Sequence, residues 1–416
     1  MRFACAALIA AITVLCSPAS AQQPSSLSLE DAFRRALEAH PDLARFRYRR
    51  DALGAELEEA RLRPQLIAGA EVENAAGTGA ASGFDQAELT LSLASVLERG
   101  DKRAARIAVA QRSVDALALT EEARRLDLLA EVARRYLDVV AMQELERIAA
   151  QDVQQRERTV EAAAQRVRAG ASPDSTRLTA VAAAARARLQ RERIRAELQA
   201  AKQRLAGSFG ERTATFQEAR GDLSPPLSVP SFDALASLLD RSPELARFAD
   251  ERRLREARLQ LAQASRTADW EWQIGMRRLE ETQDWAAVAG VSIPLGTRSR
   301  AAPAIRAAQA ELAQLELERS VEQLSLHATL SEAHARLSSA AAEVALADKD
   351  VLPVLEQAEA AAERAYRAGA LSYLEWAQVQ AERSSARRER LAAALQARKA
   401  LIEIQRLTGE PFVGTP

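Results

Sequence analysis

The chain has 416 residues, enough for two or three ordinary domains, but its composition is unusual. Hydrophobic residues make up 48% of the sequence, aromatic residues only 4% and charged residues 28%, and the formal net charge is −1. This mixture is typical of long amphipathic helices and excludes an aromatic-rich globular core. The near balance of charge gives no electrostatic argument for nucleic acid or an acidic ligand as a partner.

Residues 1–21 have the pattern of a secretory signal peptide. A positive charge at Arg2 precedes an apolar run, 3–15, that is too short to span a bilayer. The sequence Ala-Ser-Ala at 19–21 fits a cleavage site. Both cysteines lie within this segment, so the exported protein is expected to have no disulfide, no thiolate metal site and no cysteine nucleophile.

The remaining chain repeats one layout at an offset near 200 residues. The sequence ALEAHPDLARF at 36–46 is similar to LLDRSPELARF at 238–248. Likewise, RVRAGAS at 166–172 is similar to AYRAGAL at 365–371. Two halves with one layout indicate a tandem duplication. We therefore expect a first structural repeat at 22–230 and a second at 231–416. Each is expected to contain short helices, two strands and a long helical hairpin.

Four segments alternate apolar and polar residues, at about 65–74, 86–94, 269–279 and 285–295. In the second of these, Leu89 and Leu91 fall on one face, whereas Glu88 and Thr90 fall on the other. A period of two predicts strands, and the lengths are close to those of tilted outer-membrane strands. Three tryptophans lie in these segments, as an interfacial aromatic girdle requires: Trp270, Trp272 and Trp285.

A small sheet in a soluble protein is the alternative interpretation of these strands. No later stretch has the pattern of a transmembrane helix, so entry into a membrane would depend on the strands. Four strands cannot close a membrane barrel, and unpaired edges are prohibitive in lipid. The membrane interpretation therefore requires a shared barrel, with eight strands in a dimer and twelve in a trimer. The alternating pattern alone does not choose between these two.

Most of the remaining sequence predicts two helical hairpins, at about 101–207 and 303–408. No proline occurs from Asp101 to Arg168, a helical length of roughly 100 Å. In the second half, large and alanine residues alternate along a heptad seam, and Pro353 is expected to kink the rod. The predicted tips turn at glycines and continue with serines that can cap the returning helices: Gly170 and Ser172 in the first hairpin, Gly369 and Ser372 in the second.

Taken together, these features of the sequence resemble those of TolC-type outer-membrane factors. More narrowly, the chain resembles the CzcC-type outer-membrane component of heavy-metal resistance-nodulation-division efflux systems. The resemblance covers essentially all of the mature chain. It is carried by the tetrads HPDL at 40–43 and SPEL at 242–245, by LERGDKRAARIAVA at 97–110 and by YRAGALSYLEWAQVQ at 366–380.

The resemblance implies a mainly α fold with a membrane β-barrel portion. Three identical chains would share a twelve-stranded barrel in the outer membrane of a Gram-negative bacterium and extend a helical tunnel into the periplasm. The implied partners are outer-membrane lipid, a periplasmic adaptor (membrane fusion) protein and an inner-membrane pump. The implied function is passive conduction, with heavy-metal cations as the favoured cargo. The alternatives are a drug-efflux or type I secretion duct and, in another class, a soluble periplasmic coiled-coil scaffold.

The resemblance also implies a gate at the tips, held shut by polar links. Tyr366 and Glu375 match the family's gate positions. Thr176 stands where the first tip would carry an acid, and nearby Asp174 is the substitute candidate. Trp376 is either an anchor for a docking partner or a packing residue of the returning helix. The residues expected at the tips for adaptor docking are Gly170, Ser172, Gly369, Ser372 and Trp376.

No catalytic constellation, cofactor motif or metal site is predicted, so we do not expect an enzyme. The three histidines are His40, His327 and His334. The last two lie seven residues apart on one rod, roughly 10 Å along its axis. That separation is too large for one ion without a ligand from another helix, because zinc usually takes four ligands. Packed or solvated imidazoles are therefore favoured over a metal site.

Overall fold

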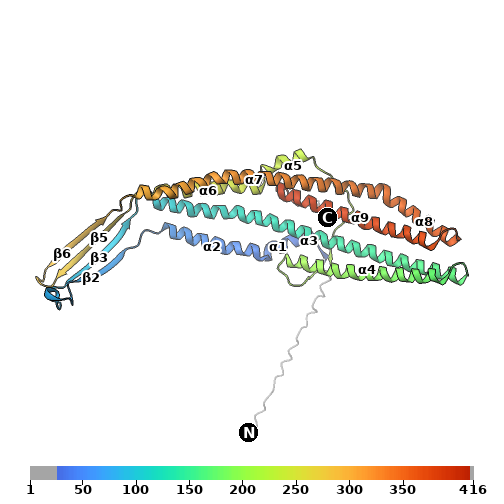
Figure 1. Cartoon of the computed structure of the whole chain (residues 1–416), viewed down its shortest axis with the longest axis horizontal. Coiled ribbons are helices and arrows are strands. Elements are labelled where there is room, and N and C mark those ends of the chain that lie inside the picture. The colour runs from blue at the N-terminus through green and yellow to red at the C-terminus, as the bar shows by residue number, and fades with distance from the viewer. Residues whose placement is uncertain (1–25, 413–416) are drawn as a thin grey trace, which may run out of the picture.

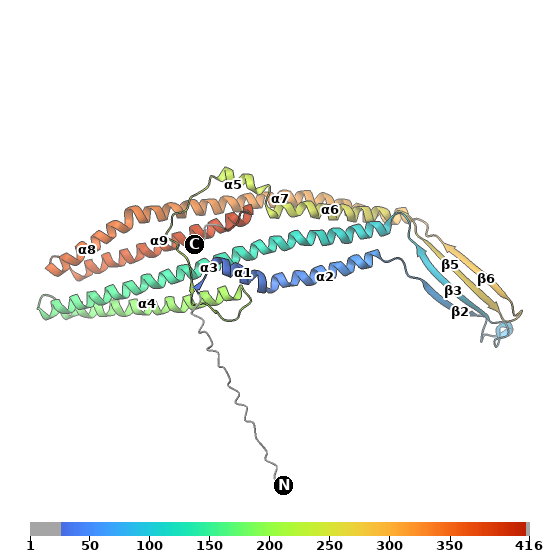
Figure 2. The same cartoon turned by 180° about the vertical axis from the view of Figure 1, so that it is seen from behind.

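The computed structural model describes residues 26–412, so the predicted signal peptide lies outside the described residues. The molecule is elongated (Figure 1). A four-stranded sheet forms one end, long helices run away from it, and two helical hairpin tips form the other end. The view from behind in Figure 2 shows the same arrangement.

The first half of the chain begins with short elements and ends with a helical hairpin. Its elements are β1 (Ser26–Leu27), α1 (Leu29–Ala39), α2 (Pro41–Arg61), β2 (Ile67–Glu73), a 3₁₀ turn (Gly79–Ala81), β3 (Glu88–Leu97), α3 (Lys102–Arg168), α4 (Asp174–Gly207) and β4 (Glu218–Ala219). At 67 residues, α3 is roughly 100 Å long, as its uninterrupted sequence predicts.

The second half follows the same order. Its elements are α5 (Phe232–Leu239), α6 (Pro243–Ala264), β5 (Trp270–Leu279), β6 (Trp285–Ser292), α7 (Thr297–Leu346), a π-helical turn (Ala347–Val351), α8 (Leu352–Ala368) and α9 (Tyr373–Thr408). The hairpin begins at Thr297 rather than at about 303, so the expected start was placed too late. Gly296 precedes the helix with φ +78°, and Pro303 lies inside it.

Equivalent prolines begin α2 and α6. Pro41 and Pro243 each occupy the first turn, where a missing backbone N–H costs nothing. The side chains before them cap the helices. His40 Nδ1 accepts from the amide of Asp42 at 3.2 Å, and Ser242 Oγ accepts from the amide of Leu245 at 3.3 Å. The matching HPDL and SPEL tetrads are therefore helix starts.

The expected interruption near Pro353 is present as a π-helical turn just before it. Proline cannot donate to the carbonyl four residues earlier, and its ring crowds that carbonyl. The wider π turn at Ala347–Val351 accommodates this conflict locally. The rod changes direction where α7 passes into α8 (Figure 1).

The largest hydrophobic core lies midway along the rods, where α3 packs against both halves of the chain. In this region α3 buries side chains on several faces, Leu128, Val132, Tyr136 and Val140 among them. The Tyr136 hydroxyl lies 2.9 Å from the carbonyl oxygen of Leu27, and burial raises the pKa of Tyr136 to about 12. This contact secures the parallel β1–β4 pair to the middle of α3.

Candidate functional site

The terminal sheet combines strands from both halves in the order β2-β3-β5-β6, with every neighbouring pair antiparallel. The central β3–β5 pair joins the two halves. Within residues 26–412, β2 and β6 each pair on one side only and leave two open edges. All four strands lie within a few residues of the predicted segments.

One face of this sheet is apolar and exposed. The register places Leu91 opposite Ala70 and Met276, and Met276 opposite Ala287, so alternate residues of four strands form one surface. A soluble sheet of this size would bury such a face. The large side chains exposed on it are Val72, Leu89, Leu91, Leu93, Ile274, Met276, Trp285 and Val291.

Tryptophans mark both ends of the apolar face. Trp270 pairs with Leu97 at the helix end, and Trp285 pairs with Arg278 at the loop end. Along β5 these levels are eight residues apart, or roughly 26 Å. Because strands of membrane barrels are tilted by about 40°, this length corresponds to a height of about 20 Å, most of the apolar band of about 25 Å on such barrels. Trp272 lies on the same face, opposite Val291, one step inside the Trp270 level.

The other face of the sheet is polar and carries an ion-pair cluster. From β5, the Arg277 guanidinium reaches Thr90 Oγ1 at 2.9 Å and Glu88 Oε2 at 2.6 Å on β3. It also lies 2.8 Å from Glu73 Oε2 on β2. Thr90 is only 3% exposed beneath it. Arg277 therefore lies along the polar face of the sheet and spans three strands.

The stretch LERGDKR forms the junction between the sheet and the rods. Gly100 has φ +70°, and a Cβ there would lie 2.5 Å from Thr267 Oγ1, so only glycine fits. Asp269, just before β5, accepts from the amide of Arg99 at 2.9 Å and pairs with Lys102 Nζ at 2.7 Å. This stretch thus fixes the direction in which α3 leaves the sheet.

At the opposite end, the second hairpin tip is capped as its sequence predicts. Gly369 ends α8 with φ +83°. Ser372 and Glu375 form a capping box: the amide of Glu375 donates to Ser372 Oγ at 3.3 Å, and the amide of Ser372 donates to Glu375 Oε2 at 2.9 Å. These hydrogen bonds hold the pKa of Glu375 below its usual range.

The first tip differs from expectation. Gly170 turns the chain with φ +69°, but Pro173 is the N-cap of α4 and makes no side-chain cap. The predicted capping role of Ser172 is therefore wrong. Its Oγ lies 3.2 Å from Arg166 Nε, and that hydrogen bond replaces the cap. Asp174 pairs with Arg177 at 2.7 Å, and this hydrogen bond lowers the pKa of Asp174.

A small aromatic core joins the two tips. Tyr366 stacks on Trp376 with ring centroids 4.9 Å apart, and both are buried. Arg166, from the first hairpin, lies 5.0 Å from the Tyr366 ring centroid and donates to the Tyr366 carbonyl. The observed role of Trp376 within the chain is therefore packing, and its docking role stays a prediction. Sequence reasoning missed Arg166, because its partners lie on another hairpin.

The proposed gate residues do not meet within one chain. The Tyr366 hydroxyl and Trp376 Nε1 are buried without a hydrogen-bond partner among the described residues. Glu375 is engaged in its capping box and Asp174 with Arg177. Any gate link made by Tyr366, Glu375 or Asp174 must therefore involve another chain or another conformation.

The two rod histidines pack around one phenylalanine. Phe232 of α5 lies edge-on to His327 at 5.3 Å and to His334 at 5.6 Å between ring centroids. His334 Nε2 also lies 2.9 Å from the Pro230 carbonyl oxygen. In residues 26–412, no group of three or more histidine, cysteine, aspartate or glutamate side chains is placed to hold a metal ion. None of the helices in this part of the chain has the length and apolar character needed to cross a bilayer.

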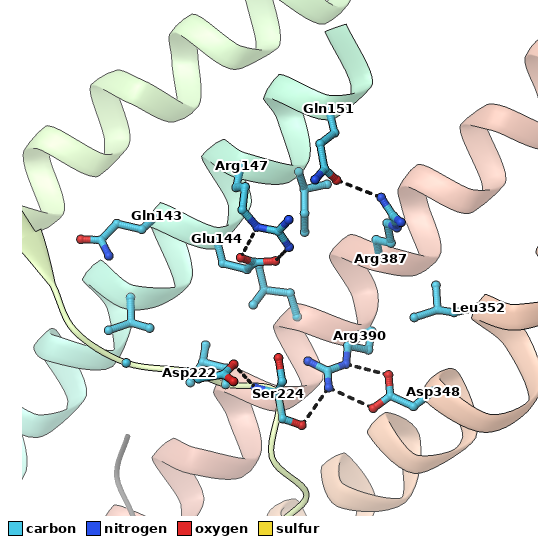
Figure 3. Close-up of a pocket in the computed structure, with 15 residues that line it drawn as sticks. Gln143, Glu144, Arg147, Gln151, Asp222, Ser224, Asp348, Leu352, Arg387 and Arg390 are labelled. Atoms are coloured by element: carbon cyan, nitrogen blue, oxygen red, sulfur yellow. Dashed lines mark hydrogen bonds and ion pairs between the residues drawn. The ribbon is translucent and has the colours of Figure 1, made fainter. Parts of the chain in front are cut away.

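A polar groove between α3 and α9 lies near the middle of the molecule (Figure 3). Arg390 binds Asp348 of the π turn through two contacts of 2.9 Å and donates to the Ser224 carbonyl at 3.1 Å. Arg147 and Arg387 also have partners, Glu144 at 2.7 Å and Gln151 at 3.0 Å (Figure 3). These polar groups of the groove are therefore paired with each other. Through its contacts with Asp348 and Ser224, Arg390 connects the π turn to the 221–224 segment.

Comparison with known proteins agrees with this architecture. The family described as outer membrane efflux protein matches residues 32–211 and 234–410. The cobalt-zinc-cadmium resistance protein CzcC of Cupriavidus metallidurans is 31% identical over 199 residues. That match spans 48% of this chain and 48% of the relative, so it reaches about half of the relative's length.

Solved structures share the fold along nearly the whole chain. CusC superposes with a TM-score of 0.78 at 15% identity, covering 92% of each chain. The outer membrane protein VceC of Vibrio cholerae gives 0.75 at 19% identity, covering 92% of this chain and 96% of that one. A membrane protein of Pseudomonas aeruginosa gives 0.76 at 18% identity, covering 93% and 92%. The predicted fold class, mainly α with a membrane β-barrel portion, is confirmed. The chain therefore belongs to the outer membrane efflux protein family, whose members lie in the Gram-negative outer membrane and extend into the periplasm.

Proposed function

We propose that this protein is the exit duct of a tripartite efflux pump and conducts its cargo passively across the outer membrane. One observation carries the proposal: a four-stranded sheet with an exposed apolar face, a polar face and two open edges continues directly into rods of roughly 100 Å. Lipid would cover the apolar face, and water would fill the space beside the polar face.

The open edges support a homotrimer. Open edges are prohibitive in lipid, so β6 of one chain must pair with β2 of the next. β6, α7 and α8 follow one long side of the molecule, whereas β2, α2 and α4 follow the other (Figures 1 and 2). Copies placed side by side can therefore close into a ring. Three copies give twelve strands, enough for an open lumen rather than one filled by side chains.

The hairpin tips are the proposed contact with a periplasmic adaptor, which would connect the duct to an inner-membrane pump. The tips lie at the far end from the membrane sheet, and Gly170, Gly369 and Ser372 are exposed there. The energy for transport would come from that pump. Links made between chains by Tyr366, Glu375 and Asp174 are proposed to close the tips when the pump is absent.

Heavy-metal cations are the proposed cargo. The similarity to a cobalt-zinc-cadmium resistance protein supports this choice. The acidic inner face of the sheet also supports it, because rings of carboxylates favour cations. Its acids are Glu71, Glu73, Glu88 and Glu271.

Planar bilayers and growth assays test the two parts of the proposal separately. Purified protein should produce stable single-channel currents, and deletion of the gene should lower tolerance to zinc, cobalt or cadmium while leaving tolerance to lipophilic drugs unchanged. Absence of channels from correctly folded protein, in both the parent and the gate variant Tyr366→Phe/Glu375→Gln, would refute the duct. Channels combined with a defect in drug tolerance alone would refute the metal cargo and keep the duct.

A further inference from the structure

The inner face of the membrane sheet has one basic side chain among many small and acidic ones. In the four described strands, alternate positions of β2, β3, β5 and β6 place four glutamates and one arginine on this face. The middle of the face is lined by small residues, including Gly69, Ser92 and Gly275, which face one another in the register. The centre of the wall therefore leaves room for solvent, and charge gathers toward its ends.

Arg277 is bound where these charges are densest, at the loop end of the strands: it lies two residues before the end of β5, and Glu73 and Glu88 are the terminal residues of β2 and β3 there. Its guanidinium contacts two carboxylates, Glu88 at 2.6 Å and Glu73 at 2.8 Å, each on a different strand. It lies against Thr90, so it follows the wall and leaves the lumen open. Glu71 stands in the same register row as Thr90 and Arg277, so three carboxylates against one guanidinium leave two negative charges per chain at this level.

We propose that Glu71, Glu73, Glu88 and Arg277 form a charge ring near the outer mouth of the barrel, and that Arg277 limits its preference for small hydrated cations. The inference rests on the proposed trimeric duct. Threefold repetition of these four residues gives a ring with net charge −6. Such a ring raises the local concentration of cations and lowers that of anions. Removing the guanidinium would change the net charge of the ring from −6 to −9.

Arg277→Gln tests this proposal through the potassium-to-chloride permeability ratio, measured from reversal potentials in a KCl gradient across planar bilayers. Raising the negative ring charge by half should raise this ratio by about 1.5-fold. Glu88→Gln halves the negative charge of the ring and should lower the ratio toward that of free solution. Arg278→Gln is the matched control, because it removes the same charge one residue away on the opposite face. It should leave the ratio at the parent value.

Assembly must be checked for each variant by native mass spectrometry, because Arg277→Gln leaves two neighbouring glutamates without their cation. If Arg277→Gln does not assemble, Glu88→Gln and the double variant Arg277→Gln/Glu73→Gln carry the test. The double variant restores the parent's net charge of −6 and should show the parent ratio. Equal ratios in the parent, Arg277→Gln and Glu88→Gln would overturn the charge ring but not the duct. Absence of channels from both the parent and the gate variant Tyr366→Phe/Glu375→Gln would overturn the duct itself.

Discussion

At the scale of single residues, Arg406 of α9 connects helices from both halves of the chain. Its guanidinium lies 2.8 Å from Glu403, 2.9 Å from Glu244 at the start of α6, and 3.2 Å from Asp127 on α3. Arg134 of α3 adds a second contact to Glu403 at 2.9 Å. Arg406 therefore shares its single positive charge among three carboxylates.

The two closest carboxylates respond to this environment in opposite ways. Burial opposes the charging of Glu403, but hydrogen bonds and charge from Arg406 and Arg134 outweigh it and hold its pKa below 4.5. For Glu244, burial prevails and its pKa is raised above 4.5. The charge of Glu403 therefore stabilises the fold above pH 4.5, and this contribution is lost as the pH falls through its lowered pKa. Glu244 has the opposite sign, because its contribution is lost as the pH rises through its raised pKa.

We expect Glu403→Gln to lower stability at pH 7 by about 1.5–3 kcal/mol, the range for hydrogen bonds to charged groups. The deficit should shrink as the pH falls below 4.5, where the parent loses the same contribution. Thermal denaturation followed by circular dichroism at several pH values measures this. Glu244→Gln is the control and should cost less at pH 7. A Glu403→Gln deficit that stays constant with pH would contradict the assignment.

Arg166 has a comparable role at the hairpin tips. It donates to the carbonyl of Tyr366 on the second hairpin and to Ser172 on its own. Arg166→Gln removes these charged hydrogen bonds, which are worth about 1.5–3 kcal/mol each, and should loosen the contact between the hairpins. We expect a higher resting conductance in planar bilayers. Arg168→Gln, an exposed arginine on the same helix, is the control and should conduct like the parent.

The proposed gate between chains has a separate test. Tyr366→Phe/Glu375→Gln changes little within one chain, because the Tyr366 hydroxyl has no partner among the described residues and glutamine can keep the capping box with Ser372. A rise in resting conductance in this double variant would therefore indicate links between chains. Unchanged conductance in both this variant and Arg166→Gln would show that neither set of contacts holds the tips closed.

At the scale of elements, the strands illustrate what the sequence can predict. The alternation of apolar and polar residues is a short-range pattern that can be recognised directly in the sequence. The predicted strand positions are therefore accurate to a few residues. The capping of α4 was not predictable in this way. Ser172 has a suitable position for a cap, but Arg166 binds its hydroxyl in the folded chain. Contacts between distant segments decide such cases, and Arg166–Tyr366 is another example.

Neighbouring residues on β5 test the membrane face. Ile274 is exposed on the apolar face near the middle of β5, and Gln273 points to the opposite face. Ile274→Arg should cost about 2–4 kcal/mol, because it places a charge in lipid near the bilayer midplane. Gln273→Arg should be far milder, because its side chain enters the water-filled lumen. Outer-membrane levels of the two variants provide the comparison, and equal losses would contradict the assignment of the faces.

At the scale of the whole molecule, the single chain leaves long apolar stripes uncovered. On α7, Leu317, Val321 and Leu324 are 69%, 66% and 73% exposed and recur at intervals of four and three residues, so they share one face. The heptad seam predicted from the sequence is different: Leu330 and Leu337 are fully buried within the chain. Periodicity thus located the internal seam, whereas the stripe became visible only once the internal packing was known.

The side-by-side arrangement of three chains predicts that a neighbour covers this stripe. Val321→Glu would then bury an unpaired carboxylate at each of three interfaces, and the symmetry of the ring would multiply the cost. We expect the variant to lose the trimer in native mass spectrometry while keeping the helical circular dichroism of the parent. Arg319→Glu introduces the same side chain at an exposed position about half a turn away on α7 and should remain trimeric. A trimeric Val321→Glu variant would place the subunit contacts elsewhere on the rods, and a parent that is monomeric in detergent would remove the basis for a shared barrel.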